Sequence, residues 1–378
     1  MSDPNHIRPL ALTLLLAGVL LLPSMATMGM FFDGMIYASL SRNLALGIGS
    51  AWVPYFSEGL YPEFRQHPPL VFWLQASLFA LFGDRWWVER LYDLGLVIAT
   101  ALLLRGLWRQ LAEITGRTAL AGYWWLALLC WILVPKWSWA YRNNVLENTL
   151  TLICLAAVVL LLVALRAESW RRRLISATSA GLLTVAGVLV KGPVALFVVA
   201  APVLLTIVVP GAWPRRTTGV ALTYTAAFVI GALVVFSIPE ARWMLDEYQR
   251  QQLMNRVGLG QRDAAMLLEL LTKLAPMVVV AIIATSVATI AAKSVETIAP
   301  ATVARARRRP GGGGTGRTVA AMLALGLSAS LPLALGDFDS AHYLLPALPY
   351  YAIAFGLFAA ARLDDAGLRP LLERKPGA

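Results

Sequence analysis

Charged side chains are scarce in this sequence. They make up 14% of its 378 residues, whereas hydrophobic residues make up 58%, and the mean hydropathy is +0.67. Because soluble globular domains carry about 25% charged residues, this composition excludes an ordinary soluble domain. Most of the chain must face lipid or other apolar segments of the same chain.

Cysteine is also nearly absent. The two cysteines, Cys130 and Cys154, both lie within apolar runs, so neither a disulfide framework nor a thiolate metal site is expected. The apolar runs lack the strict alternation of polar and apolar residues found in membrane-spanning strands, which excludes a transmembrane barrel and leaves helices. No convincing internal repeat is present.

Long apolar runs recur from one end of the sequence to the other. Each approaches the roughly 20 residues that a helix needs to cross a bilayer, so we predict an all-α polytopic membrane protein with about ten spanning helices, forming a single module over residues 1–378. The first run follows Arg8 without a small-residue cleavage site after it, so we expect a retained anchor. The predicted spans are 9–30, 87–107, 119–136, 149–166, 173–190, 193–210, 217–238, 272–292, 318–336 and 344–361.

Positive charge is concentrated in alternate loops. The net charge of +11 is explained better by membrane orientation than by a nucleic acid partner, since loops rich in Lys and Arg remain in the cytoplasm. This rule places both termini in the cytoplasm. We expect a protein of the bacterial inner membrane. The basic, glycine-rich segment 293–317 is expected to be a flexible cytoplasmic connector. The clustered residues are Arg105, Arg109 and Arg117; Arg166 and Arg171 to Arg173; Arg215 and Arg216; and Arg305 and Arg307 to Arg309.

The other loops then face outward: 31–86, 137–148, the turn at Lys191, 239–271 and 337–343. Within the first of these loops, Met35, Ala38, Leu40 and Leu44 have helical spacing and predict an amphipathic surface helix. Residues 69–82 are apolar but short for a span, so we expect a helix at the outer interface. If this segment crossed the bilayer, the basic stretch 166–173 would lie outside, against the charge rule.

Several polar residues in these outer loops are candidates for a functional site. Asp33 lies just ahead of the predicted surface helix, where it either caps the helix or serves as a functional carboxylate. The stretch WSWAYRNNVLENT places Arg142, Asn144 and Glu147 within a few residues, together with Asn143 and Asn148. Capping needs only one such residue, so this density favours a functional site.

Lys191 stands between two apolar runs and is followed by Gly192 and Pro193. It either extends its ammonium to the interface or binds an anion such as a lipid-borne phosphate. His67, in QHPPL, is by itself equally compatible with an ordinary surface histidine. Asp337, Asp339 and His342 (DFDSAH) suggest a metal site only weakly, because a three-residue cluster on one loop is not specific.

Five motifs occur in an order that resembles a known family, the C-type glycosyltransferases (GT-C) that use polyprenyl-phosphate sugars. This family includes bacterial aminoarabinose transferases and protein O-mannosyltransferases. The motifs are FFDGMIYASLSRNLALG; FRQHPPLVFWL with the FG turn and Arg90 after it; YRNNVLENTLTL; LVKGPVALFVVAAP; and HYLLPALPYYAIAFG.

The resemblance implies transfer of a sugar from a polyprenyl-phosphate carrier to a lipid, glycan or protein acceptor on the periplasmic face. It implies that Asp33 is the catalytic base and that Lys191 contacts the donor phosphate, with Arg42 and Arg142 as lesser candidates. Glu147 is expected to orient the acceptor or to share a divalent cation, Mg²⁺ or Mn²⁺, with Asp33. The expected substrate-binding residues are Tyr37, His67, Asn144, His342 and Tyr343.

Three departures from the family pattern are visible. Gly34 stands where many relatives have a second acid, and His67 stands where some have lysine. The chain also ends soon after the HYLLPALP motif, without the outer domain of larger members. These differences bear on the acceptor and on the metal more than on the reaction class.

Two other functions remain open. A transporter or flippase for a lipid-linked saccharide would place charges deep within helices and show internal repeats. A non-catalytic scaffold would not explain why Asp33, Glu147 and Lys191 share one side of the membrane. The sequence alone does not identify the sugar, the carrier or the acceptor.

Overall fold

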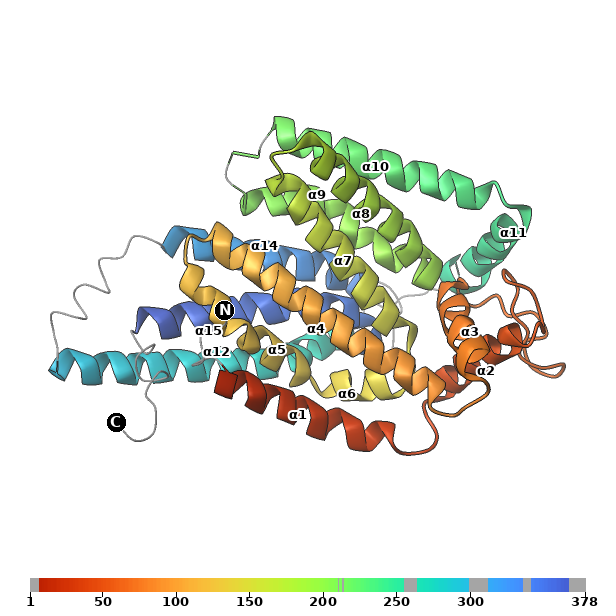
Figure 1. Cartoon of the computed structure of the whole chain (residues 1–378), viewed down its shortest axis with the longest axis horizontal. Coiled ribbons are helices and arrows are strands. Elements are labelled where there is room, and N and C mark those ends of the chain that lie inside the picture. The colour runs from red at the N-terminus through yellow and green to blue at the C-terminus, as the bar shows by residue number, and fades with distance from the viewer. Residues whose placement is uncertain are drawn as a thin grey trace.

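The computed structural model describes residues 7–209, 211–212, 214–254, 264–298, 312–335 and 341–366, and this part of the chain is built of helices. Its longest helices run roughly side by side along the long axis of the molecule (Figure 1). They are α1 (Ile7–Met25), α4 (Val88–Ile114), α7 (Leu146–Arg166), α8 (Trp170–Lys191), α10 (Arg215–Phe236), α12 (Ala264–Ile298), α14 (Gly312–Ser330) and α15 (Leu348–Asp365).

Eight helices of the described residues are long and apolar enough to cross a membrane, or nine if the bent pair α5 (Trp124–Ile132) and α6 (Pro135–Arg142) is counted as one span. The prediction of a multi-pass, all-helical membrane protein is therefore confirmed. The number of eight or nine spans is below the predicted ten partly because the ranges 173–190 and 193–210 are counted together as one helical stretch, Trp170–Ile207.

That run reverses direction at its middle. The 3₁₀ helix η3 (Gly192–Ala200) packs back against α8, so that a Cβ built on Gly187 would lie 2.9 Å from Ala195 Cβ. In a straight helix, residues eight apart are separated by about 12 Å along the axis. The two predicted ranges thus form a tight hairpin whose tip is Lys191 and Gly192.

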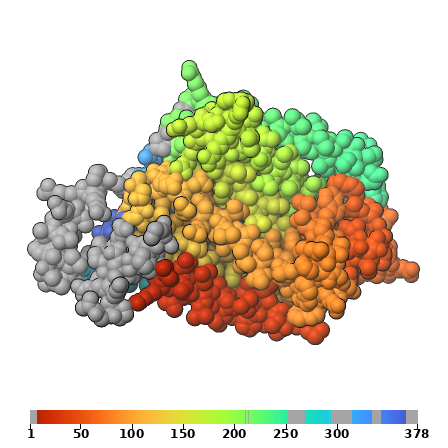
Figure 2. Space-filling model, in the orientation of Figure 1, coloured from red at the N-terminus to blue at the C-terminus, as the bar shows by residue number. Residues whose placement is uncertain are grey.

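Helices α7 and α15 form the centre of the bundle, and α1 and α10 lie at its outside. Of the residues in the most apolar 18-residue stretch, 72% are buried in α7 and 83% in His342–Asp365, which contains α15, whereas 11% are buried in α1 and in α10. The space-filling view shows α1 lying along one outer edge (Figure 2). Helix α15 is rich in alanine, and small residues allow helices to approach closely inside a membrane bundle. Its buried alanines include Ala352, Ala354, Ala359 and Ala360.

Three shorter helices, α2 (Phe32–Ala45), α3 (Leu70–Phe82) and α11 (Pro239–Tyr248), gather at one end of the bundle (Figure 1). The predicted helix at 69–82 is found as α3, and Pro69 precedes its first turn, where a fixed φ suits helix entry. The predicted surface helix is found as α2. Of its predicted apolar positions, Ala38 and Leu40 are buried, whereas Met35 is 45% exposed, and Ile36 and Tyr37 complete the buried face.

Helices also extend into both of the long predicted loops. In 239–271, α11 begins at Pro239 and α12 begins at Ala264; in 293–317, α12 continues to Ile298 and α14 begins at Gly312. Residues 255–263 and 299–311 lie outside the described residues, and the second range contains the whole predicted cluster of Arg305 and Arg307 to Arg309. Asp337 and Asp339 also lie outside the described residues.

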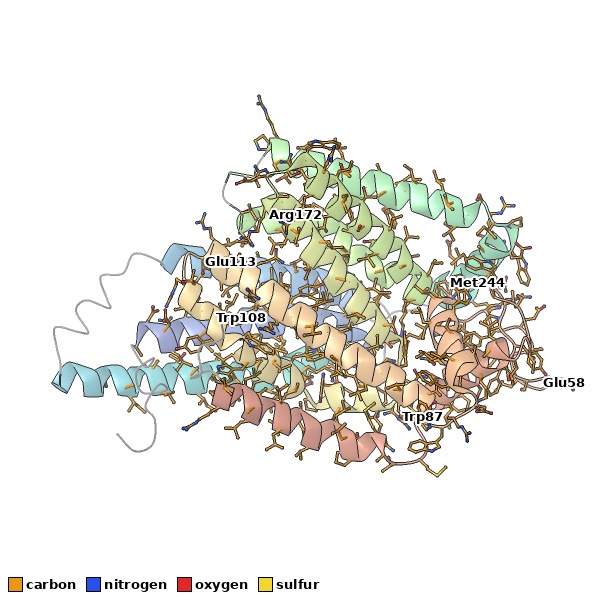
Figure 3. All side chains as sticks on the ribbon, viewed as in Figure 1. Glu58, Trp87, Trp108, Glu113, Arg172 and Met244 are labelled. Atoms are coloured by element: carbon orange, nitrogen blue, oxygen red, sulfur yellow. The ribbon has the colours of Figure 1, made fainter. Side chains whose placement is uncertain are left out.

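The two ends of the bundle differ in character. Glu58, Trp87 and Met244 lie at the end formed by α2, α3 and α11, whereas Glu113 and Arg172 lie toward the other end (Figure 3). The basic loops after α4 and α7 belong to this second end. There Arg117 pairs with Asp364 and Asp365, at 2.5 and 2.8 Å, and Arg166 pairs with Glu113 at 2.8 Å. The side of the membrane to which each end belongs stays a prediction.

Candidate active site

A buried ion pair joins α7 to the tip of the α8 hairpin. Glu147 lies in the first turn of α7, Lys191 is the last residue of α8, and the Lys191 ammonium donates a hydrogen bond to Glu147 Oε1. The side chains of Glu147 and Lys191 are 1% and 6% exposed. Because a buried charge is costly without a partner, each of these residues depends on the other.

The backbone at the hairpin tip requires glycine. Gly192 has a φ of +62°, and a Cβ at this position would lie 2.6 Å from the Tyr248 ring and hydroxyl. The Tyr248 hydroxyl donates a hydrogen bond to the Lys191 carbonyl at 3.4 Å. Helix α11 therefore packs directly over the break in α8, and this contact fixes the position of the Lys191 backbone.

The 3₁₀ helix η7 (Ala341–Ala347) brings two more predicted residues to this pair. His342 Nε2 lies 3.6 Å from Glu147 Oε1, and the Lys191 ammonium lies 4.0 Å from the centre of the Tyr343 ring. A cation over an aromatic face is stabilised by the ring quadrupole. Trp139 extends this group, with its ring 5.7 Å from that of His342.

Asp33 approaches the same group from α2. Burial raises the pKa of its carboxyl above the ordinary value, and the charge on Glu147 adds to this, while His342 and Lys191 oppose it. The N-cap of α2 is Phe31, so Asp33 lies inside the first turn and does not cap the helix. Among the described residues its carboxylate accepts no hydrogen bond, which leaves it available to accept a proton.

Two adjacent asparagines position the start of α2. The Phe31 amide donates to Asn143 Oδ1 at 2.6 Å, and Asn144 Nδ2 donates to the Gly34 carbonyl at 3.2 Å. A Cβ on Gly34 would lie 2.1 Å from the Asn143 carbonyl oxygen. The departure at Gly34 therefore has a steric cause, because the 143–144 turn occupies the space that a second acid would need.

The side chain of Asn144 is fully used in contacts between α2, α3 and the turn before α7. Asn144 has a φ of +52°, and its side-chain amide pairs with that of Gln75 on α3, with 2.5 Å between Gln75 Nε2 and Asn144 Oδ1. It thereby joins α2, α3 and the turn before α7. Its predicted contact with substrate remains untested, and the contacts formed here are structural.

The start of α4 holds the same turn from the other side. Arg90 donates hydrogen bonds to the Arg142 carbonyl and, at 2.7 Å, to the Gly29 carbonyl, and Asp93 Oδ1 accepts one from Asn148 Nδ2 at 2.9 Å. Arg90 was predicted only as part of a motif, and Asp93 was not predicted. Charged residues in the first turns of a predicted span were the available signal.

Tyr37 and His67 lie on the α2 and α11 side of the site. Burial raises the pKa of Tyr37 well above its ordinary value, and the charges of Asp33 and Glu147 add to this effect. Its ring lies 5.8 Å from that of His67, which lies 6.2 Å from that of Tyr248. An aromatic layer thus connects Asp33's helix to α11.

Arg42 and Arg142 have other surroundings. Arg42 pairs with Asp84 at 2.6 Å in the last turn of α2. Arg142 ends α6, and its carbonyl accepts the hydrogen bond from Arg90. No contact among the described residues joins either arginine to Glu147 or Lys191, so the structure does not bring them into the group formed by Asp33, Glu147, Lys191, His342 and Tyr343.

The side chains around Asp33 and Glu147 show whether a divalent cation could bind between them. The described residues contain no group of three or more His, Cys, Asp or Glu side chains placed to hold a metal ion. The Lys191 ammonium already donates a hydrogen bond to Glu147 Oε1, so one of the two predicted carboxylates has a cationic partner. The Asp33 and Glu147 pair therefore does not fit the predicted Mg²⁺ or Mn²⁺ site, and no chemical step is derived through a metal.

Comparisons with known proteins agree with the motifs. Residues 66–243 match the family model described as dolichyl-phosphate-mannose-protein mannosyltransferase, a range that contains Glu147 and Lys191 but not Asp33, His342 or Tyr343. No curated protein sequence matches the chain significantly.

Solved structures show the same fold at low sequence identity. ArnT from Cupriavidus metallidurans, bound to undecaprenyl phosphate, superposes with a TM-score of 0.58 at 18% identity over 95% of this chain and 60% of that chain. The Archaeoglobus fulgidus oligosaccharyltransferase, in complex with Zn and sulfate, gives 0.55 at 15% identity over 96% of this chain and 49% of that chain. The chain thus spans less than two thirds of the length of either relative. The family model and the shared fold together confirm the resemblance of this chain to the C-type glycosyltransferases.

Proposed function

We propose that this protein transfers a sugar from a polyprenyl-phosphate carrier to an envelope acceptor, with inversion at the anomeric carbon. The reaction takes place on the periplasmic face of a bacterial inner membrane, with both termini in the cytoplasm. The observation that carries this proposal is the buried Glu147–Lys191 pair beside the free carboxylate of Asp33. These groups lie at the end of the bundle formed by α2, α3 and α11, away from the basic loops.

Each group has a role in a direct displacement. Asp33 accepts the proton of the acceptor hydroxyl as its oxygen forms a bond to the anomeric carbon. The bond from that carbon to the carrier phosphate breaks, and the phosphate leaves with the bonding electrons. The Lys191 ammonium offsets the charge that develops on this phosphate.

Glu147 and Tyr343 hold Lys191 in place. The Glu147 carboxylate on one side and the face of the Tyr343 ring on the other fix the Lys191 ammonium. His342 lies beside the same carboxylate and so shares its negative charge with Lys191. The hydrogen bond from Tyr248 to the Lys191 carbonyl fixes the backbone as well. Placing the phosphate-binding charge in advance avoids reorganisation during the reaction.

The test is transfer of a radiolabelled sugar from a polyprenyl-phosphate donor in proteoliposomes. We expect Asp33→Asn and Lys191→Met to lose transfer while still inserting and folding. Asp84→Asn and Arg166→Gln, which alter ion pairs away from the group, serve as matched controls and should keep it. Full transfer by both site variants would refute the assignment.

The same assay separates this function from that of a flippase. A flippase moves the lipid-linked sugar across the bilayer and leaves its glycosyl-phosphate bond intact. Movement of the intact donor to the opposite leaflet, with no release of polyprenyl phosphate, would favour transport over transfer.

A further inference from the structure

An apolar groove of about 890 Å³ lies between α1, α5, α12 and α15, outside the group around Glu147. All but one of its lining residues are apolar, the exception being Thr272. Val279 and Ile283, on α12, are 51% and 56% exposed. Lipid in the surrounding bilayer can therefore reach the groove from the side.

The groove is elongated along the bundle. Its wall on α12 extends from Thr272 to Val287, which corresponds to about 22 Å at 1.5 Å per residue. Pro9 and Leu363 line it in the first turn of α1 and the last turns of α15, and Leu133 lines it just before α6. Its length is most of the roughly 30 Å hydrocarbon core, so its shape and chemistry suit a lipid chain.

Positive charge lies next to the Leu133 and Thr272 end of this groove. Lys136, in the first turn of α6, lies 3.7 Å from the centre of the Trp139 ring and forms no ion pair within the described part of the chain. Lys273, next to Thr272, is close enough to act on Lys136 electrostatically, and it pairs with Glu269 at 2.5 Å. Glu269 also acts on Lys136, with the opposite sign. Among the described residues here, two lysines thus face one glutamate, and the remaining positive charge favours an anionic head group.

This end of the groove leads directly to the active-site group. The Trp139 ring that carries the Lys136 ammonium is 5.7 Å from the His342 ring, and His342 lies 3.6 Å from Glu147. Helix α11, which packs on Lys191, lies on the opposite flank of the bundle from α1, α6 and α12 (Figure 1). The groove and α11 therefore lie on different sides of the active-site group around Glu147 and Lys191.

We propose that this groove binds the acceptor, and that the acceptor is a membrane lipid with an anionic head group. The lipid chain lies along α12, and the head group lies at Lys136, within reach of Asp33's neighbours. The word acceptor rests on the proposed function, which assigns the donor phosphate to Lys191. The groove has a cation of its own, Lys136, apart from the Lys191 assigned to the donor phosphate, and this separation matches a second substrate. A soluble glycan or a protein would require a polar groove.

Lipid binding can be tested without catalysis. The full-length protein in nanodiscs is irradiated with phosphatidic acid that carries a diazirine on one acyl chain, or with phosphatidylcholine that carries the same chain. We expect cross-links on the α12 peptides to favour phosphatidic acid about fivefold, the attraction of one lysine. Lys136→Gln should abolish the preference, and Arg166→Gln, at the other end of the bundle, should keep it. Equal cross-linking by both lipids would mean ordinary surrounding lipid and would overturn the proposal.

Transfer kinetics test the assignment to the acceptor. The assay uses the radiolabelled donor and the purified anionic lipid fraction of bacterial envelopes as acceptor. Val279→Trp and Ile283→Trp fill the groove, and Ile230→Trp on α10, which is 62% exposed, is the matched control. We expect the two groove variants to raise the acceptor KM about tenfold, the effect of losing about two buried methylene groups, with the donor KM unchanged.

The other outcomes are decisive. An increase in the donor KM would assign the groove to the carrier chain, and label appearing in protein instead of lipid would exclude a lipid acceptor; either overturns the proposal. If the wild-type protein transfers no sugar, the proposed function fails, while the cross-linking result still decides whether the groove binds an anionic lipid.

Discussion

Lys191 donates a hydrogen bond to the Glu147 carboxylate across 44 residues of sequence, and both side chains are shut off from solvent. Removing one partner of such a pair leaves an uncompensated buried charge, which costs about 3–5 kcal/mol, whereas removing both partners costs far less. We expect Lys191→Met to lower the Tm strongly and Lys191→Met with Glu147→Gln to recover most of the loss, without recovering transfer. Thermal unfolding in detergent measures the first effect and the sugar-transfer assay the second. Additive losses of stability would contradict the pairing.

The rate of transfer should depend on pH through Asp33. A general base works in its ionised form, so the rate rises as pH increases through the pKa of this carboxyl, and burial places that pKa above the ordinary aspartate value. We expect His342→Phe to move the acidic limb of the pH–rate profile to higher pH, because His342 lowers the Asp33 pKa. Asp33→Asn should lower kcat about 10²- to 10⁴-fold at every pH. A profile that is the same in wild type and His342→Phe would remove His342 from this role.

The sequence predicted the helical bundle well because a spanning helix leaves a continuous apolar signal of its own. Each predicted span falls on helical residues. The count of eight or nine is below ten because the range 119–136 belongs to a bent helix pair and because Trp170–Ile207, which turns back on itself at Gly192, is counted once. That reversal depends on the contact of η3 with α8. A hydropathy pattern does not contain this contact.

Only those site residues that carry a local signal in the sequence were predicted. Asp33, Glu147 and Lys191 were recognised from local features, either a motif or a charge in an apolar setting, and the structure brings them together. Arg42 was expected at the donor phosphate but pairs with Asp84. Asp93 was missed because its importance depends on Asn148, a partner 55 residues away.

Arg90 and Asp93 are expected to act on transfer by positioning other residues. Arg90 joins the α1–α2 connection to the turn before α7, and lysine lacks the fork of donors needed to reach both carbonyls. We expect Arg90→Lys to lower kcat about 100-fold, the effect of a displacement near 1 Å, with the donor KM nearly unchanged. Kinetics over a range of donor concentrations measure the two constants separately. An increase in KM alone would indicate direct contact with the donor instead.

Removal of divalent cations with a chelator tests whether transfer depends on a metal ion. Because the Glu147 carboxylate is already paired with the Lys191 ammonium, we expect transfer to continue at full rate after dialysis against EDTA. Added Mg²⁺ or Mn²⁺ should leave the rate unchanged. Loss of transfer on chelation, with recovery on adding one of these ions, would instead restore the two-carboxylate site that the sequence predicted.

Gly34 tests whether the first turn of α2 has room for a side chain. A Cβ at this position would lie 2.1 Å from the Asn143 carbonyl, whereas a Cβ on Gly59 would meet nothing within 4 Å. We expect Gly34→Ala to destabilise the protein by about 1–3 kcal/mol, the usual effect of overpacking, and to reduce transfer by displacing Asp33. Gly59→Ala should change neither the Tm nor transfer. Gly34→Asp, which introduces the second acid found in many relatives, should be less active than wild type, because the carboxylate cannot enter without moving the 143–144 turn. Higher activity in Gly34→Asp would show that this turn yields and that the missing acid, rather than space, limits the site.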